Sequence, residues 1–162
     1  MSSPRLGWAA CLGAVLLLCC GSLAAAEEVT RDSYREAVEP LCKQNAQANM
    51  RIFKGVRKMV RQHQLKSAAA RFAKAAAALK QTMGQLERVP KPPADEIRLK
   101  KWLDDVSIEV SLFERTAAKF RADDARAAFL LVSRLTHQAN VANSVVIPFE
   151  FHYCKLDPSR FT

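Results

Sequence analysis

Glycine is scarce in this sequence, and the motifs of the common enzyme classes are missing. Only 5 of the 162 residues are glycine. No Gly-X-Ser-X-Gly, phosphate-loop or dinucleotide-binding motif occurs, although each of these chemistries needs glycine at fixed positions. Alanine is abundant instead, and β-branched residues are few until near the end. This composition predicts an all-α protein and offers no catalytic constellation.

The residue patterns of metal and cofactor sites are lacking as well. A di-iron helical bundle needs Glu-X-X-His pairs, and covalently bound haem needs Cys-X-X-Cys-His. Neither pattern occurs, and the three histidines, His63, His137 and His152, are widely separated. We therefore predict no metal site and no cofactor.

Acidic residues are absent between Glu39 and Glu87, although basic residues recur there. The net charge of the chain is +9, so this excess is concentrated in one segment. The segment is interpreted either as a solvated face or as a surface for an anionic polymer or membrane. Because aromatic residues for stacking on bases are lacking, sequence-specific nucleic-acid binding is not expected. The candidate anion-binding residues are Arg51, Lys54, Lys58, Arg61, Lys66, Arg71 and Lys74.

Residues 1–26 have the pattern of a secretory signal peptide. Arg5 precedes an apolar stretch from Leu6 to Leu23, and the alanines at positions 24–26 stand before two glutamates. This boundary predicts cleavage after Ala26, leaving residues 27–162 as a single domain. An uncut leader would instead be long enough to span a bilayer, and a lipid on Cys19 or Cys20 would also anchor the chain. We expect a cleaved leader, and hence a secreted or cell-envelope associated protein.

Two cysteines, Cys42 and Cys154, lie outside the leader. In an oxidising compartment such a pair is expected to form one disulfide. Two cysteines are too few for a structural zinc site, and these are too far apart in the sequence for a redox Cys-X-X-Cys pair.

Hydrophobic periodicity predicts four helices joined by short connections. The first begins at Thr30 as N-cap and continues to Met59, with Pro40 either delaying its start or kinking it. The second covers residues 65–86 and is ended by the prolines of residues 90–93. The third covers residues 96–120. The fourth begins at Asp123 or Asp124 and runs toward Cys154, with a kink or an early end at Pro148.

Four such helices predict an up-down-up-down four-helix bundle closed by one disulfide. In that topology the first and last helices are antiparallel neighbours, so Cys42 and Cys154 lie at the same end. The predicted topology and the predicted disulfide were reached from different features of the sequence, and they agree.

A polar layer is expected between the first and last helices. Asn45 and Asn49 occupy inward-facing positions of the first helix, and His137, Asn140 and Asn143 lie in the last one. Because buried amides must be hydrogen-bonded, we expect these side chains to meet. The layer is interpreted as a network that sets the helix register, or alternatively as a small-molecule site with His137 as its titratable group.

The cysteine and asparagine patterns resemble a group of short exported helical proteins of actinobacteria. Members share an early cysteine with nearby asparagines, here Cys42, Asn45 and Asn49. They also share an Asn-rich helix that ends in an aromatic-cysteine motif, here Asn140, Asn143, Phe149, Phe151 and Cys154. The resemblance covers most of residues 27–162 but implies no activity and no functional residue. The prediction from the sequence is therefore an exported, non-catalytic bundle that binds an anionic envelope component through its first two helices. Small-molecule binding at the polar layer is the alternative.

Overall fold

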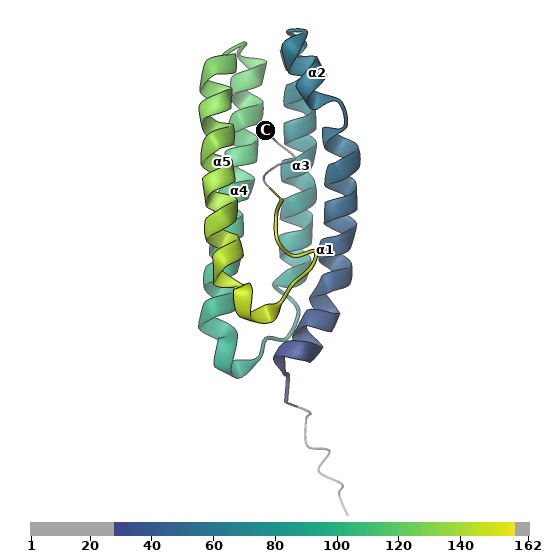
Figure 1. Ribbon diagram of the computed structural model, residues 1–162, viewed down its shortest axis with the longest axis vertical. Coiled ribbons are helices and arrows are strands. Elements are labelled where there is room, and N and C mark those ends of the chain that lie inside the picture. The colour runs from purple at the N-terminus through teal and green to yellow at the C-terminus, as the bar shows by residue number, and fades with distance from the viewer. Residues whose placement is uncertain (1–27, 158–162) are drawn as a thin grey trace, which may run out of the picture.

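A computed structural model of the chain is all-helical in the residues that it describes, 28–157 (Figure 1). The predicted leader, residues 1–26, lies outside this range. Four long helices run side by side, and one short helix and two single 3-10 turns join or follow them. The elements are α1 Arg31–Phe53, α2 Val56–Arg61, α3 Leu65–Leu86, η1 Pro93–Asp95, α4 Glu96–Arg121, α5 Ala125–Val145 and η2 Ile147–Phe149.

The starts of the helices confirm the expected caps. Thr30 forms a capping box with Ser33, in which each side chain bonds the backbone N–H of the other residue. Asp124 accepts a hydrogen bond from the Ala127 backbone N–H at 3.0 Å. Because these side chains satisfy backbone donors that a helix leaves open, they favour helix starts at these positions. Pro40 does not delay α1, which includes it.

The first predicted helix ends earlier than the sequence pattern indicated. α1 ends at Phe53, and Gly55 has a left-handed backbone (φ 81°) between α1 and the short helix α2. Glycine adopts this conformation without steric cost, so it breaks a helix even where the apolar spacing continues. The prediction of one helix up to Met59 was therefore wrong.

The last helix also stops short of Cys154, as the option of an early end at Pro148 allowed. α5 ends at Val145, and Pro148 lies in the 3-10 turn that follows. Glu150 then takes a left-handed backbone (φ 53°), which turns the chain back along the bundle. Residues 150–157, here called the C-terminal strap, run between α1 and α5 (Figure 1).

The strap changes the packing that the predicted bundle implied. α1 packs mainly against α3, α3 against α4, and α4 against α5. The sequence pattern predicted that α1 and α5 are direct neighbours, but the strap occupies the space between them. Cys42 and Cys154 do lie at the same end, with a Cα–Cα distance of 4.8 Å and the sulfur atoms at bonding distance. The cysteine pair therefore joins α1 to the strap rather than to a helix.

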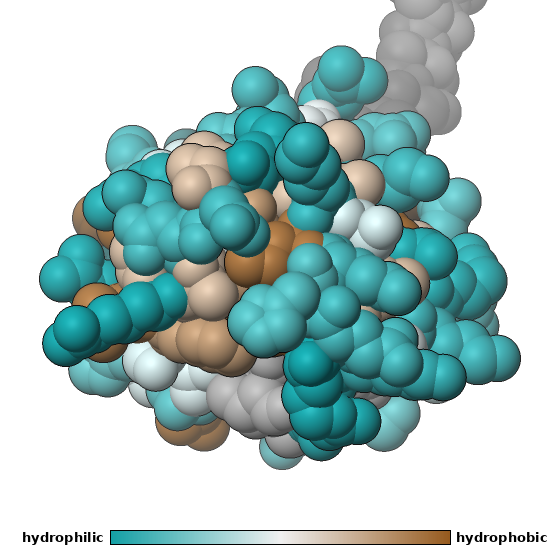
Figure 2. Space-filling model, turned by 90° about the horizontal axis from the view of Figure 1, so that it is seen from above, coloured by the Kyte–Doolittle hydropathy of each residue, from teal (hydrophilic) through white to brown (hydrophobic). Residues whose placement is uncertain are grey.

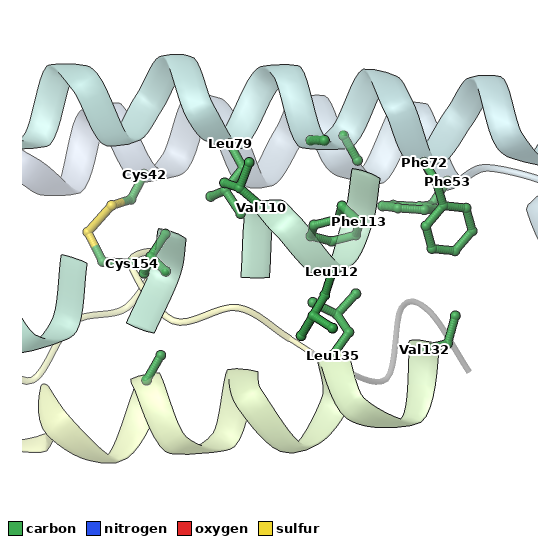
Figure 3. Close-up of a cluster of buried hydrophobic side chains, with 14 of the residues drawn as sticks. Cys42, Phe53, Phe72, Leu79, Val110, Leu112, Phe113, Val132, Leu135 and Cys154 are labelled. Atoms are coloured by element: carbon green, nitrogen blue, oxygen red, sulfur yellow. A yellow bond between two sulfur atoms is a disulfide. The ribbon is translucent and has the colours of Figure 1, made fainter. Parts of the chain in front are cut away.

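The core differs along its length. Phe53, Phe72, Phe113 and Phe120 form a chain of ring contacts at centroid distances of 5.1–6.1 Å toward the α2 end. Figure 3 shows Phe53 and Phe72 at one end of the view and the disulfide at the other, with Leu79 and Val110 between them. Around the disulfide the buried residues come from α1, α3, α4, α5 and the strap, and they surround a cavity.

Candidate functional site

A cavity of about 470 Å³ lies between the helices and the strap at the disulfide end of the bundle. α1, α3, α4 and α5 each contribute to its wall, and strap residues 152–157 line its fifth side. A strap is thinner than a helix and carries different side chains, so it does not fill the space that a helix packed on α1 would fill. The volume lies in the range of small-molecule sites, about 300–1,000 Å³.

Four large apolar residues of the cavity wall come from α3 and α4. Leu79 and Leu86 of α3, with Trp102 and Val106 of α4, line the cavity and belong to the buried core. The indole of Trp102 packs on the ring of Phe151 at a centroid distance of 5.5 Å. The strap therefore holds an aromatic wall residue in place.

Two asparagines of α1 that line the cavity each carry a buried oxygen without a protein partner. Asn45 and Asn49 both line the cavity, and the Oδ1 atom of each is buried without a hydrogen bond among the described residues. Residues four apart on a helix lie on the same face, so the two amides are neighbours. Because a buried oxygen without a partner costs about 1–3 kcal/mol, such atoms are uncommon in folded proteins.

Glu109 of α4 is the third residue of the cavity wall with an unpartnered buried oxygen. Its residue surface is 1 % exposed, and its Oε1 atom has no hydrogen-bond partner in the part of the chain that the structure describes. Burial, together with the nearby carboxylate of Asp105, raises the pKa of Glu109 from 4.5 to about 8. The side chain is therefore an uncharged carboxylic acid at neutral pH.

The strap is held by three independent anchors around the cavity. The Glu39 carboxylate accepts the backbone N–H groups of His152 at 2.6 Å and Tyr153 at 3.0 Å. The Asn143 side chain donates to the Leu156 carbonyl at 2.9 Å and accepts its N–H at 3.1 Å. Since Glu39 lies on α1 and Asn143 on α5, these bonds and the Cys42–Cys154 pair fix the strap to both flanking helices.

The predicted polar layer is only partly assembled. Asn45, Asn49 and Asn143 line the cavity, whereas His137 and Asn140 are exposed on α5 and do not join them. His137 lines a separate groove with Ile108 and Leu112 on the outer side of α4 and α5. His137, Asn140 and Asn143 follow one another at steps of three, and this spacing did not reveal which of them faces inward.

Sequence reasoning missed Glu109, the most deeply buried ionisable group of the cavity. The signal was present, because Trp102, Glu109 and Thr116 are spaced by seven and all three are buried. α4 contacts both α3 and α5, so a second stripe of its surface faces inward. Asp105, one turn before Glu109, is also buried at 7 % exposure and bonds Lys101 (2.8 Å) and Gln138 (3.3 Å).

The candidate anion-binding residues are distributed over α1, α2 and α3. Arg71 is half-buried, and the others, Arg51, Lys54, Lys58, Arg61, Lys66 and Lys74, are exposed. The break at Lys54 and Gly55 places Arg51 on α1 and both Lys58 and Arg61 on α2, so these residues do not lie along one continuous helix. None of the seven forms an ion pair with an acid among residues 28–157.

Residues 28–157 contain no group of three or more histidine, cysteine, aspartate or glutamate side chains placed to hold a metal ion. No helix among them has the length and the apolar character that crossing a membrane requires. Comparisons of the chain with protein-family models, with curated proteins and with solved structures find no match.

Proposed function

We propose that this protein binds a small molecule in the cavity between α1, α4 and the C-terminal strap. The observation that carries the proposal is the set of three unpartnered buried oxygens, on Asn45, Asn49 and Glu109, that belong to one cavity. A network that only sets helix register satisfies its own hydrogen bonds. These groups do not satisfy one another, which favours a ligand that bonds them.

A fragment library screened by thermal shift, with hits located by amide chemical-shift changes, tests this function. A ligand that binds only the folded state raises the melting temperature. We expect hits to shift amides of α1, α4 and the strap. Asn49→Leu should abolish the response, while Asn140→Leu, at an exposed position of α5, should retain it. A screen in which no fragment shifts the cavity amides would contradict the proposal and make the amides structural.

The basic surface is a second candidate site, for an anionic polymer or a membrane surface. Six of its seven residues are exposed without an acidic partner in residues 28–157. The bundle end that carries α2 is covered mainly by hydrophilic side chains around a smaller apolar area (Figure 2). Such a surface attracts polyanions, and the attraction weakens as salt screens it.

Co-sedimentation with polyphosphate and with anionic vesicles, at low and high salt, tests the second candidate. We expect the wild type to bind at low salt and not at high salt. The Lys54→Glu, Lys58→Glu double variant should bind at neither salt concentration. The Lys100→Glu, Arg115→Glu double variant, at exposed positions of α4, changes the net charge equally and should bind like the wild type. Binding that the control loses equally would reflect net charge rather than this surface.

We also propose that the helices follow an up-down-up-down course and that the protein is exported after cleavage at Ala26. The short connections and the pairings of α1 with α3, α3 with α4 and α4 with α5 support the course. The leader pattern supports export. Antiparallel nuclear Overhauser contacts between successive helices test the first statement. Amino-terminal sequencing of the protein from its native compartment, with Glu27 expected first, tests the second.

A further inference from the structure

Three residues that line the cavity carry buried oxygens without a hydrogen-bond partner among residues 28–157. The buried atoms without a partner around it are all oxygens, namely the Oδ1 atoms of Asn45 and Asn49 and Oε1 of Glu109. An amide oxygen accepts hydrogen bonds, and the Glu109 carboxyl only accepts them once it is ionised. A ligand that satisfies this set with an ionised Glu109 therefore needs several N–H or O–H donors.

The charged groups of the cavity wall indicate which charge the ligand carries. Glu109 forms no ion pair within residues 28–157, although Asp105, one turn earlier, is paired with Lys101 at 2.8 Å. From α1, α3 and α5 the cavity is lined by uncharged side chains, among them Asn49, Thr82 and Asn143. The other charged or titratable groups of the wall are His152, Tyr153, Lys155 and Asp157, all from the strap. A buried carboxyl without a cationic partner is the group that a cationic ligand would stabilise most.

The apolar wall suits the remainder of such a ligand. Trp102 lines the cavity, and an indole is the best aromatic partner for a cation. Leu79, Leu86 and Val106 offer apolar contact beside it. A compact organic body with a positively charged end would bury its apolar part here while its N–H groups reach the oxygens.

We infer that the ligand is a small organic cation, an amine or guanidinium on an apolar body, held by Asn45, Asn49 and Glu109. This inference rests on the proposed function and specifies its ligand class. An ammonium group carries three donors, which matches the three unpartnered oxygens. A carboxylate facing a bound cation also gains a charge-assisted hydrogen bond, the stronger kind.

Binding of a cation has a proton signature that binding of a neutral molecule lacks. In the free protein the raised pKa of about 8 keeps Glu109 protonated at pH 6. A bound cation favours the charged carboxylate, so the carboxyl releases its proton as the ligand binds. Affinity for the cation should therefore rise with pH, by up to about tenfold per unit, until Glu109 is ionised in the free protein.

Three probes of similar size separate the ligand classes: phenethylamine, 2-phenylethanol and phenylacetate. Each is titrated into the oxidised protein by calorimetry at pH 6 and pH 8, in two buffers of different ionisation enthalpy. We expect phenethylamine to bind more tightly than the other two probes. Its affinity should be at least about tenfold higher at pH 8 than at pH 6, and its binding at pH 6 should release close to one proton.

Variants assign the proton. Glu109→Gln should weaken the binding of phenethylamine and remove the pH dependence of its affinity. Glu114→Gln, at an exposed position of the same helix, should change neither. Histidines generally change charge at about pH 5–8, so His152→Gln is included and should keep the dependence. The pH profile and the proton release are measured on the wild type, so they remain decisive even if Glu109→Gln fails to fold.

Two results would overturn the inference. Binding of 2-phenylethanol or phenylacetate at least as tightly as phenethylamine would reject the cation class and leave the cavity as a binding site. Absence of binding by all three probes would also reject it. The fragment screen then decides separately whether the cavity binds any small molecule.

Discussion

The two ends of this bundle solve the same packing problem in opposite ways. Toward α2 the helices close on a chain of phenylalanines, with ring centroids as close as 5.1 Å for Phe53 and Phe72. Toward the disulfide the strap takes a position beside α1, and a cavity with buried amides and a buried carboxyl remains. Large aromatic side chains bury area and specify close packing. Where the chain provides a strap and polar residues instead, stability depends on anchors, and the space becomes available for a ligand.

Removing the cysteine pair should give the largest effect, with the disulfide end of the bundle affected most. In the chain-entropy model, a cross-link that closes a loop of 112 residues contributes about 4–5 kcal/mol. We expect the Cys42→Ser, Cys154→Ser double variant to lose stability of this order in urea unfolding. Amide exchange should accelerate more at the strap and around Cys42 than at Phe72, Phe113 and Phe120. Equal acceleration at both ends would show that the strap supports the whole core.

Truncating the phenylalanine core is the matching change at the other end. Phe113 is fully buried and contacts the rings of Phe53 and Phe72. Phe113→Ala should cost about 3–5 kcal/mol, since it removes a buried ring and leaves a cavity. Chemical denaturation measures the loss. Ligand-dependent shifts of strap amides should survive in this variant, and their disappearance would mean that the two ends are coupled.

Neutralising the buried carboxyl should remove a pH dependence of stability. Between pH 4.5 and about 8 the folded state keeps the Glu109 proton that the unfolded chain releases. The stability that this group contributes is therefore complete below pH 4.5 and is lost as pH rises to about 8, by up to about 1.4 kcal/mol per unit. Glu109→Gln should flatten the unfolding free energy over pH 5–8 relative to wild type. Equal pH profiles of wild type and variant would show that Glu109 is solvated in the folded state.

Replacing a buried amide with an apolar side chain should give the smallest effect, of opposite sign. Asn49 is 3 % exposed, and its unpartnered oxygen carries a desolvation cost. Asn49→Leu should raise the unfolding free energy by about 1 kcal/mol. Thermal unfolding without added ligand measures it, with Asn140→Leu expected to stay within about 0.5 kcal/mol of wild type. A destabilised Asn49→Leu variant would show that the amide bonds its neighbours and that the layer is structural.

Local chemistry made much of the fold predictable. Thr30 and Asp124 cap helices because their side chains reach backbone donors a few residues away. The proline-rich segment after α3 ends that helix for equally local reasons. The helix break at Gly55 was not predicted, because the apolar spacing continues across its left-handed backbone. The cavity was predicted only in part, because Asn45 and Asn49 were expected to face inward but Glu109 was not.

By itself, the sequence determined the helical character, three of the four long helices and the pairing of Cys42 with Cys154. Each depends on neighbouring residues or on a choice among few partners. Only the tertiary structure decided that the strap separates α1 from α5, that His137 and Asn140 face outward, and that Glu109 is buried. The physical reason is that burial depends on which surfaces meet. One left-handed residue, Glu150, redirects the chain after α5, and the spacing of residues along a helix does not encode where that redirected chain will lie.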